Sequence, residues 1–412
     1  MEPQRPSRVV IVGAGHAGSN AAAFLRQFGW PGEVLLLGGE PALPYHRPPL
    51  SKAWLKGEAT AESLALRPAA FYEAQRIGLR TGTRVEGLDH AARRLRLAGG
   101  EALAYDHLVL ATGARARRIP LPGAELPGVL ALRNAADADR LKAALGPGRH
   151  IAVVGAGWIG LEVAASARAL GARATVLEAA PRALARVASP ALSAFVEAAH
   201  RAQGVALLTG AGVEAIEPDA AGRAAAVRLA DGTRIACDAV LMGVGAVAED
   251  GLARDAGLAD PTGGVFVDAR ARTAEDGIHA IGDLTIRPLP GGTGRLESVP
   301  SAVEQARQAA ADLCGRPPPA PEVPWFWSDQ YHLRIQVAGL CQGMARSVPR
   351  GDPAAGDRLA VFHLDAAGAV RAVEAVNAAP EFMAGKRLIA GGRPVAPDHL
   401  ADPSRPLQAL AA

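Results

Sequence analysis

Two stretches of the chain share one pattern, an apolar run followed by spaced glycines and then a segment with helical spacing. The first is VVIVGAGHAGSN, residues 9–20, and the second is IAVVGAGWIGLE, residues 151–162. Four consecutive apolar residues are typical of a buried parallel strand. A G-x-G-x-x-G turn after such a strand holds a dinucleotide pyrophosphate at a helix N-terminus. Two strand–turn–helix units and two bound dinucleotides are therefore predicted. A glycine-rich turn without a ligand is the alternative for either copy taken alone.

The three glycines of the first unit have separate tasks in such a turn. Gly13 permits the sharp turn, Gly15 lets the pyrophosphate approach the backbone, and Gly18 lets the helix pack on the strand. The matching glycines of the second unit are Gly155, Gly157 and Gly160. We expect the two units to share one geometry.

The strand after each unit should end in an acidic residue, which hydrogen-bonds the hydroxyls of an adenosine ribose. In the second unit Glu178 closes the strand ATVLE, and a 2′-phosphate there would meet like charge, so NADH is expected in preference to NADPH. Arg186 follows and could favour a phosphate, but a partner of Glu178 or of the pyrophosphate is the better explanation. In the first unit the only acid is Glu40, which arrives late, after Gly38 and Gly39.

Two further apolar runs end in small or acidic residues. YDHLVLATG, residues 105–113, predicts a buried strand that ends in a corner of small residues open to a ligand. GIHAIGDL, residues 277–284, predicts a strand that ends at Asp283, a candidate acceptor for sugar-like hydroxyls; an ordinary turn aspartate is the alternative. A helix is predicted from about Ser298, with Ser298 as its N-cap and Pro300 in the first turn.

The C-terminal part has a different pattern. CGRPPPAPEVP, residues 314–324, is a proline-rich boundary that is not expected to be helical. The stretches LRIQVAGL, RLAVFHL and AVRAVEAVN follow it and alternate as strands do. A small α+β domain is therefore predicted after the boundary.

Composition limits the possible functions. A chain of 412 residues exceeds one ordinary core, so two or three domains are expected. No apolar stretch approaches the roughly 20 residues that span a bilayer, and strand-like sequence from Val9 argues against a secretory signal. Cys237, Cys314 and Cys341 are scattered without metal-ligand spacing, which fits a reduced cytoplasm and predicts no metal site. A net charge of +3 is too small to indicate nucleic acid.

The order G-x-G-x-x-G, A-T-G, second G-x-G-x-x-G and G-D resembles the flavoprotein reductases of the glutathione-reductase structural class. The resemblance runs from residue 8 to about residue 315. It implies FAD at the first site and a nicotinamide dinucleotide at the second. Reductases of this class that use thiol chemistry carry a reactive cysteine near residues 43–57 or in the second domain, but no cysteine precedes Cys237 here. Thiol chemistry is therefore not expected.

The stretch PYHRPPLSK, within residues 43–57, resembles the signature of NADH-dependent ferredoxin reductases of bacterial oxygenases, the putidaredoxin reductase type. GWIGLEVAASAR, ESVPSAVEQAR and PWFWSDQY match the same family, so the resemblance covers nearly the whole chain. The implied reaction takes hydride from NADH to FAD, then passes single electrons to a small acidic [2Fe–2S] ferredoxin that supplies a monooxygenase or dioxygenase. One departure is that the family commonly has proline and asparagine where this chain has Ala248 and Glu249. It affects the expected nicotinamide contacts.

The fold that the resemblance implies is α/β, with two Rossmann-like dinucleotide-binding domains for FAD and NAD and a small α+β C-terminal domain. The expected bounds are 1–113 with 245–315 for the FAD domain, 114–244 for the NAD domain and 316–412 for the C-terminal domain. A cytoplasmic protein is expected, with a monomer favoured, and with neither nucleic acid nor a membrane as a partner.

The resemblance also places Lys52 behind the flavin, paired with Glu162 on the helix that the second glycine motif opens. An ammonium near flavin N5 stabilises the electron density that arrives as hydride, and a carboxylate keeps that ammonium oriented. A solvated surface pair is the alternative, and such a pair contributes only about 0–1 kcal/mol. Lys52 and Glu162 are therefore predicted as the catalytic residues.

Further contacts are implied only by the resemblance. Arg133 would contact FAD, with a surface salt-bridge partner as the alternative, and Trp327 would belong to a lid over the flavin, with core packing as the alternative. Arg67 and Arg307 would lie on the ferredoxin docking surface, or merely solvate their turn and helix. The other implied FAD residues are Gly13, Gly15, His16, Ala17, Gly18, Gly39, Glu40, Arg47, Pro48, Lys52, Val85, Ala111, Thr112, Gly113, Gly282, Asp283, Ser298 and Val299. The implied NAD residues are Gly155, Gly157, Trp158, Ile159, Gly160, Glu162, Glu178, Arg186, Gly243, Val244 and Gly245.

Two other functions are left open at this point. A related reductase could use rubredoxin, a quinone or dioxygen as its acceptor. A flavoprotein without an enzymatic role could recruit partners in its NADH-bound form.

Overall fold

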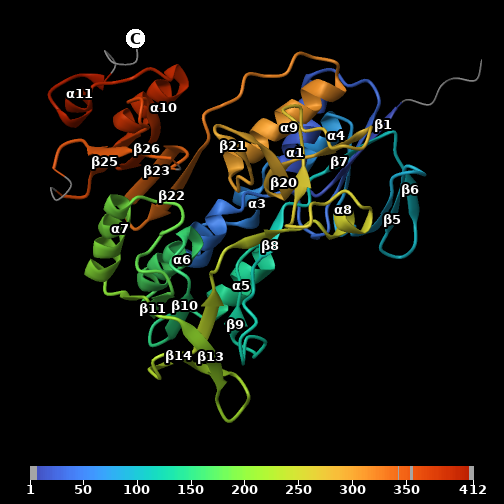
Figure 1. Ribbon diagram of the computed structural model, residues 1–412. Coiled ribbons are helices and arrows are strands. Elements are labelled where there is room, and N and C mark those ends of the chain that lie inside the picture. The colour runs from blue at the N-terminus through green and yellow to red at the C-terminus, as the bar shows by residue number, and fades with distance from the viewer. Residues whose placement is uncertain (1–6, 342, 353–355, 408–412) are drawn as a thin grey trace, which may run out of the picture. The chain divides into compact units, whose positions relative to one another are not determined.

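The computed structural model describes residues 7–341, 343–352 and 356–407, and the chain forms two compact units (Figure 1). Unit 1 runs to His46 and includes Thr60–Arg115 and Ala246–Glu322. Unit 2 comprises Arg47–Ala59, Ala116–Gly245 and the part from Val323 onward. This grouping does not test the three-domain bounds given above, which stay a prediction.

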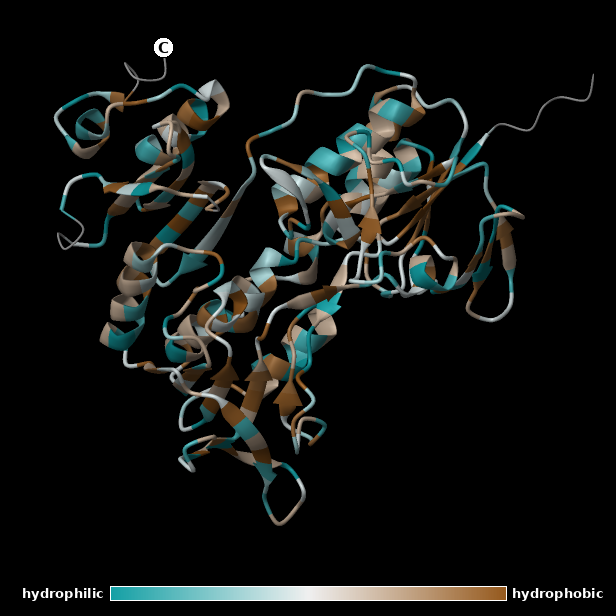
Figure 2. Ribbon diagram, viewed as in Figure 1, coloured by the Kyte–Doolittle hydropathy of each residue, from teal (hydrophilic) through white to brown (hydrophobic). Residues whose placement is uncertain are grey.

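Unit 1 is built on a parallel sheet in the order β19-β7-β1-β2-β3. In β1, Val9 and Ile11 face one side of the sheet and Val10 and Val12 the other, and all four are buried. The first side is covered by α1 and α9, which pack against each other (Figure 1). The second side packs against the small antiparallel sheet β4-β5-β6. Burial on both sides explains the continuous apolar runs, brown in Figure 2.

The elements of unit 1 are β1 (Arg8–Val12), α1 (His16–Gln27), β2 (Glu33–Leu37), α3 (Ala61–Leu64), α4 (Ala69–Ala74), β3 (Ile77–Arg80), β4 (Val85–Asp89), β5 (Arg94–Leu97), β6 (Ala102–Ala104), β7 (His107–Leu110), β8 (Ala114–Ala116), β17 (Ala246–Ala248), α8 (Gly251–Asp255), β18 (Val265–Phe266), β19 (Ile278–Ala280), η2 (Gly282–Leu284), β20 (Thr285–Leu289), β21 (Gly292–Gly294) and α9 (Val299–Leu313).

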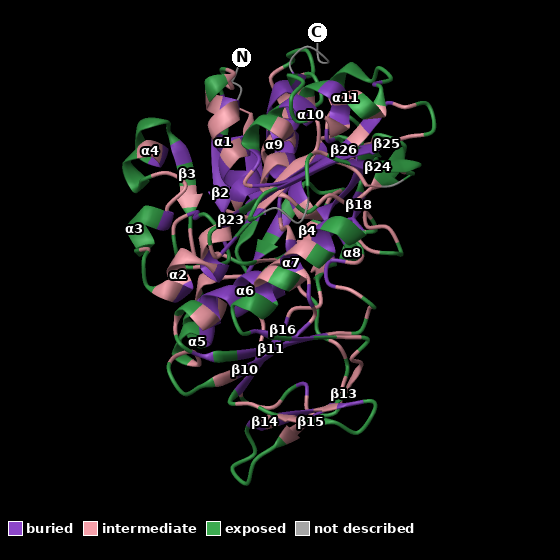
Figure 3. Cartoon of the chain, turned by 90° about the vertical axis from the view of Figure 1, so that its left-hand side faces the viewer, coloured by how far each residue is buried: buried purple, intermediate pink, exposed green. Residues whose placement is uncertain are grey.

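Unit 2 contains a second parallel sheet, in the order β12-β11-β10-β16-β9. The central strands β10, β11 and β16 are almost wholly buried (Figure 3). The C-terminal segment adds an antiparallel sheet, β22-β23-β26-β25-β24, against which α10 packs. The strands that alternation predicts in this segment are confirmed, and residues 314–324 form no helix.

The elements of unit 2 are η1 (Pro48–Ser51), α2 (Ala53–Lys56), β9 (Val129–Leu130), α5 (Ala135–Ala143), β10 (His150–Val154), α6 (Trp158–Ala169), β11 (Arg173–Glu178), α7 (Pro190–Ala202), β12 (Ala206–Thr209), β13 (Val213–Pro218), β14 (Ala224–Leu229), β15 (Arg234–Ala236), β16 (Ala239–Met242), β22 (Trp325–Gln330), β23 (Leu333–Gly339), β24 (Arg346–Pro349), β25 (Leu359–Leu364), β26 (Val370–Val376), α10 (Ala379–Gly391) and α11 (Pro397–Ala401).

The predicted fold class is confirmed: an α/β chain with two Rossmann-like glycine motifs and an α+β C-terminal part. The predicted helix start is also confirmed, because the Ser298 hydroxyl accepts the N–H of Ser301 and Pro300 lies in the first turn of α9. Among the described residues no helix is both long and apolar enough to cross a membrane.

The end of α9 is tied to the parallel sheet of unit 1 by the carboxylate of Asp312. His279 on β19 lies 2.9 Å from it, and Arg272 and Arg270 donate to it at 2.6 and 3.2 Å. Burial by itself raises the pKa of Asp312, but the hydrogen bonds from these three residues outweigh it. The pKa of this carboxyl therefore lies below its ordinary value.

We expect Asp312→Asn to lower the free energy of unfolding by about 2 kcal/mol, the scale of hydrogen bonds to a charged group. Because the folded-state pKa is depressed, the stabilisation is complete above the ordinary carboxyl pKa of about 3.9 and is lost as the pH falls below it. Urea unfolding between pH 3 and pH 7 measures both effects. Asp276→Asn is the control, since the Asp276 side chain is fully exposed beside Arg93. Equal acid sensitivity of the Asp312 variant and the wild type would contradict the assignment.

Candidate functional site

The first glycine turn, between β1 and α1, leaves open space at one position only. A Cβ on Gly13 would lie 2.2 Å from the Ala111 carbonyl oxygen, and one on Gly18 would lie 1.9 Å from the Gly13 carbonyl oxygen. A Cβ on Gly15 would meet no atom within 4 Å. Gly13 also has a φ of +113°, which favours glycine. The turn is thus closely packed at its first and third glycines and open at the second, at the N-terminus of α1, as a pyrophosphate requires.

Other sequence-predicted segments of unit 1 meet around this turn. A Cβ on Gly282, in η2, would lie 3.0 Å from the Cβ of Ala17 on α1, so the G-D motif packs against the glycine helix. Asp283 lies in η2, and Ser298 caps α9, which packs against η2. Gly113 adopts a φ of +74° just after β7. These residues therefore surround one end of the parallel sheet.

One of the two residues that depart from the family pattern, Glu249, contacts the A-T-G corner. The Thr112 hydroxyl donates to the Glu249 carbonyl oxygen at 2.6 Å, and the Glu249 N–H donates to the Gly113 carbonyl oxygen at 2.9 Å. Ala248 is buried at the end of β17. Glu249 contributes only backbone atoms to the two hydrogen bonds, so its side chain is not needed for this contact.

The expected ribose contact of the first site stays a prediction. The Tyr45 hydroxyl donates to the Glu40 carboxylate at 2.5 Å. A Cβ added to Gly39 would meet no atom within 4 Å, so there is open space beside this residue. The ring nitrogens of His16 and His46 lie 3.3 Å apart. Val85, the remaining unit 1 residue of the FAD set, begins β4.

The second glycine turn, in unit 2, repeats the geometry of the first. A Cβ on Gly155 would lie 2.5 Å from the Gly243 carbonyl oxygen, and one on Gly160 would lie 2.3 Å from the Gly155 carbonyl oxygen. A Cβ on Gly157 would have only the Gly243 oxygen near it, at 3.9 Å. Open space again lies at the second glycine, at the N-terminus of α6. Ile159, in the first turn of that helix, is an exposed large apolar residue.

Glu178 turns back toward the second glycine turn. Its carboxylate accepts the N–H of Ala156 and the N–H of Ala180, both at 2.8 Å. The acid thus lies at the end of β11 beside the glycines, as a ribose acceptor would. Arg186 forms no ion pair with Glu178 in the described structure. Its guanidinium lies beside Gly245 instead: a Cβ added to Gly245 would lie 3.4 Å from Arg186 Nη2. Of the two partners expected for Arg186, Glu178 is not contacted in the described structure, and the pyrophosphate stays a prediction.

Lys52 and Glu162 form a largely buried ion pair within unit 2. The Lys52 ammonium lies 2.7 Å from Glu162 Oε2, and the two side chains are 17% and 6% exposed. The ammonium also donates to the Pro48 carbonyl oxygen at 3.1 Å. The Ser51 hydroxyl donates to the same carboxylate oxygen, Oε2. The pair is therefore not the solvated surface pair of the alternative, while its action on a flavin stays a prediction.

The other oxygen of Glu162 has a partner that sequence reasoning missed. The Ser328 hydroxyl, on β22, donates to Glu162 Oε1 at 2.5 Å. Phe326 packs on Trp158 with ring centroids 4.9 Å apart, so β22 turns alternate residues toward α6. The sequence feature that could have indicated this contact is the spacing of Ser328 and Gln330, two polar residues that point to the same side of an otherwise aromatic strand.

Trp327 lies on the opposite side of β22 from Ser328. Its ring centroid is 5.6 Å from that of Trp325, and the Trp325 ring contacts Phe382 of α10. Trp327 therefore belongs to a sheet strand, and the lid role stays a prediction. Arg47 donates to the Arg133 carbonyl oxygen at 2.7 Å, which joins these two FAD candidates within unit 2.

The two docking candidates both contact α1. The Arg67 guanidinium donates to Asn20 at 2.9 Å and to Ser19 at 3.2 Å. Arg307 lies over the Phe24 ring at 5.2 Å and remains 44% exposed. Arg67 thus has a structural role in unit 1, whether or not a partner docks there.

A group of the partly buried Cys341 and the buried His363 and Glu374 has ligand atoms within 4.8 Å of one another. Sequence reasoning missed it because the three residues come from separate strands or strand ends. The Glu374 carboxylate accepts the N–H and the hydroxyl of Ser189, the N-cap of α7, and lies 3.1 Å from His363. Through these hydrogen bonds Glu374, on β26, holds the N-terminus of α7 against the C-terminal sheet, which gives the group a structural role.

The three cysteines are free and partly buried. Burial raises the pKa of Cys237 to about 11 and that of Cys341 to about 12, and it also raises the pKa of Cys314. Thiols with raised pKa values hold little thiolate at neutral pH and are weak nucleophiles. This agrees with the expected absence of thiol chemistry.

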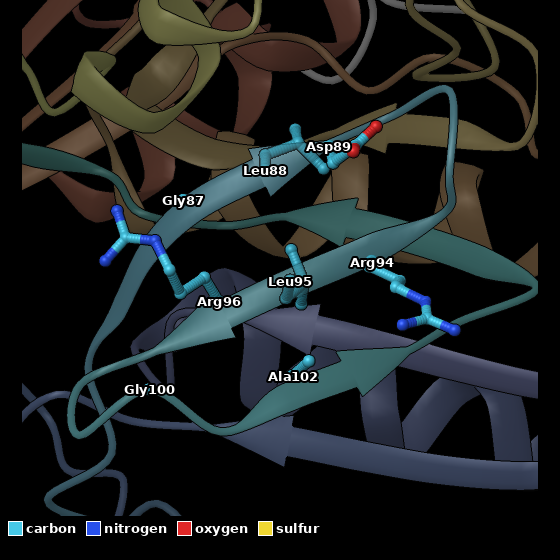
Figure 4. A pocket seen from close by; sticks show the side chains of 8 residues that line it. All are labelled: Gly87, Leu88, Asp89, Arg94, Leu95, Arg96, Gly100 and Ala102. Carbon is cyan, nitrogen blue, oxygen red and sulfur yellow. The ribbon is translucent and has the colours of Figure 1, made fainter.

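A shallow hollow lies on the sheet β4-β5-β6 (Figure 4). Arg96 and Asp89 line it, and Arg96 is paired with Glu86 at 3.0 Å. None of its lining residues belongs to the glycine turns or to the Lys52–Glu162 pair. It therefore adds no group to the candidate chemistry.

Comparison with known proteins gives two family matches and close relatives along the whole chain. Residues 7–306 match the family described as pyridine nucleotide-disulphide oxidoreductase, and residues 325–411 match the reductase C-terminal family. A probable ferredoxin reductase of Castellaniella defragrans is 49% identical over 407 residues, 98% of each chain. Putidaredoxin reductase of Pseudomonas putida is 41% identical, covering 98% of this chain and 96% of that one. The crystal structure of a covalent putidaredoxin reductase–putidaredoxin complex aligns with a TM-score of 0.94 at 40% identity, covering 98% of both chains.

Proposed function

This chain belongs to the pyridine nucleotide-disulphide oxidoreductase family, and from that premise we propose that it is an FAD-dependent NADH:ferredoxin reductase. Its acceptor would be a [2Fe–2S] ferredoxin that supplies a monooxygenase or dioxygenase. The observation that carries the proposal is the pair of open glycine turns, at Gly15 and at Gly157. One dinucleotide can then donate electrons and the other can accept them.

The residues divide the work between binding and orientation. Gly15 and the N-terminus of α1 would hold the FAD pyrophosphate, while Gly157, the N-terminus of α6 and Glu178 would hold NADH. When bound, FAD accepts a hydride and gives up its electrons singly, as an iron–sulfur protein requires. The Lys52 ammonium, held by Glu162, would stabilise negative charge during the transfer. The N-terminus of α9 would do the same through its helix dipole.

Cytochrome c reduction tests the acceptor. With NADH, the purified protein should reduce cytochrome c much faster when a [2Fe–2S] ferredoxin is added than without it. A rate that does not depend on ferredoxin would favour a quinone, rubredoxin or dioxygen acceptor instead.

Glu178 should set the preference for NADH. The wild type should show a higher kcat/KM for NADH than for NADPH, because the carboxylate repels a 2′-phosphate. Glu178→Ala should reduce the difference in activation free energy between the two cofactors by about 1–3 kcal/mol, the scale of a lost buried hydrogen bond. Steady-state kinetics with both cofactors measures this, and Glu214→Ala, an exposed acid paired with Arg228, is the control. Equal use of both cofactors by the wild type would refute the assignment.

We propose that Arg67 and Arg307 steer an acidic ferredoxin. Charges more than about 10 Å apart are screened at 0.1 M salt, so a steered encounter weakens as salt rises. Arg67→Glu or Arg307→Glu should slow ferredoxin reduction several-fold and flatten its salt dependence, while NADH–ferricyanide activity stays intact. The control is Arg96→Glu, which replaces an exposed arginine on β5 of unit 1. If ferredoxin reduction and ferricyanide reduction fell together, the arginines would only stabilise the fold. The hydrogen bonds of Arg67 to α1 are consistent with that outcome.

A cytoplasmic location is part of the proposal, supported by three free cysteines without a disulfide. A monomer is proposed as the functional form. Sedimentation of the purified protein would test whether it is a monomer.

A further inference from the structure

Four hydrogen bonds link Glu162 to the far end of β22. Ser328 lies 2.5 Å from Glu162, Gln330 lies 3.1 Å from Ser328, and His200 lies 2.8 Å from Gln330. The Tyr331 hydroxyl lies 3.2 Å from the other ring nitrogen of His200. We name these five residues, Glu162, Ser328, Gln330, His200 and Tyr331, the polar row. All of them belong to unit 2.

The direction of every bond in the polar row follows from the carboxylate. Ionised Glu162 only accepts, so the Ser328 hydroxyl must donate to it and must in turn accept the Gln330 amide N–H. The Gln330 carbonyl oxygen then faces His200, which must carry a proton on Nε2. His200 Nδ1 is left to accept the Tyr331 hydroxyl. Ser328, Gln330 and His200 each donate one bond and accept another, and such aligned bonds polarise and strengthen one another.

Burial makes this arrangement rigid. Ser328 and His200 are 0% exposed, Gln330 is 1% and Glu162 is 5%. Burial lowers the pKa of His200, which favours the neutral ring that the row requires. Burial also raises the pKa of Tyr331, although Arg168 opposes it, so Tyr331 stays a donor.

We propose that the polar row positions Glu162 for the hydride step, with Ser328, Gln330 and His200 as positioning residues. The row holds Oε1 of Glu162 from the side of β22, which leaves Oε2 to Lys52 and Ser51. The row therefore fixes the orientation of the Glu162 carboxylate and, through it, the position of the Lys52 ammonium. This inference rests on the proposed role of the Lys52–Glu162 pair.

Removal of the Ser328 hydroxyl tests the inference in the flavin-loaded protein. Ser328→Ala should slow flavin reduction by NADH about tenfold, the scale of one lost hydrogen bond to a charged group. The midpoint potential of the flavin should shift in the same direction as in Glu162→Gln. Ser328→Thr, which keeps a hydroxyl, should restore both. Ser193→Ala is the control, because it removes another buried hydroxyl of unit 2, one that donates to the Ala183 carbonyl oxygen.

A double variant gives the sharper test. Ser328→Ala should slow the reaction less in the Glu162→Gln background than in the wild type, because both changes act on one group. Gln330→Leu, which breaks the next bond of the row, should act in the same direction and replaces Ser328→Ala if that variant does not fold.

The outcomes distinguish a failure of the polar-row inference from a failure of the proposed role of the Lys52–Glu162 pair. If Lys52→Ala and Glu162→Gln slow the reaction while Ser328→Ala and Gln330→Leu behave like Ser193→Ala, the polar row is only structural and the inference is wrong. If Lys52→Ala and Glu162→Gln also have no effect, the proposed role of the ion pair fails and the inference falls with it.

Discussion

Lys52→Ala should slow the reduction of bound flavin by NADH about 100-fold, while the protein stays folded and retains FAD. The magnitude is that of losing one preorganised charged or hydrogen-bonding group from a transition state. Lys52 is suited to this because Glu162 and Pro48 hold its ammonium in a largely buried position. Stopped-flow absorbance under anaerobic conditions measures the rate, and the flavin midpoint potential should fall in the same variant.

Lys56→Ala is the matched control for this prediction. Lys56 is the last residue of the short helix α2, of which Lys52 is the N-cap, but its ammonium pairs with Glu58, whose side chain is 58% exposed. Surface pairs of this kind contribute about 0–1 kcal/mol. Flavin reduction should therefore stay at the wild-type rate. An unchanged rate in Lys52→Ala as well would show that Lys52 only stabilises the fold.

Replacement of the second glycine in each turn should remove one dinucleotide and spare the other. Gly15→Val should yield a folded protein whose FAD affinity is lower by about 100-fold, which is about 2.7 kcal/mol. A Cβ at this position meets no protein atom within 4 Å, so we expect the side chain to fill the space that a pyrophosphate needs. Bound flavin per chain after gel filtration, together with the circular dichroism of the protein, measures the outcome.

Gly157→Val should give the complementary result. This variant should retain FAD and be reduced by dithionite, yet need about 100-fold more NADH for half-maximal flavin reduction. Gly18→Ala serves as the contrast, because its Cβ would lie 1.9 Å from the Gly13 carbonyl oxygen and should disturb the fold itself. Full flavin content in Gly15→Val, or loss of flavin in Gly157→Val, would reverse the assignment of the two sites.

Features set by local backbone geometry could be predicted from the sequence. The glycine turns, the N-cap at Ser298 and the ends of the parallel strands depend on residues within a few positions of one another. The Lys52–Glu162 pair joins distant segments, and only the resemblance to a family indicated it. The structure adds that the pair is largely buried.

Features set by the packing of distant elements could not be predicted. Ser328 reaches Glu162 only because β22 packs on α6, and no spacing along the chain indicates that contact. The choice between Glu178 and the pyrophosphate as the partner of Arg186 could not be made from the sequence for a related reason: the position of both side chains depends on the folded turn, where Glu178 accepts a backbone N–H. The hydrogen bonds of Arg67 to α1 are equally invisible in sequence, since most arginines simply lie on the surface.

The most direct test of the central claim is an anaerobic two-step experiment with the purified, flavin-loaded protein. One equivalent of NADH should remove the visible absorbance of oxidised flavin within the time of a catalytic turnover. Addition of oxidised [2Fe–2S] ferredoxin should then restore that absorbance while the ferredoxin becomes reduced. If NADH leaves the flavin oxidised, or if the reduced protein returns to the oxidised form only when dioxygen is admitted, the protein does not carry electrons from NADH to ferredoxin.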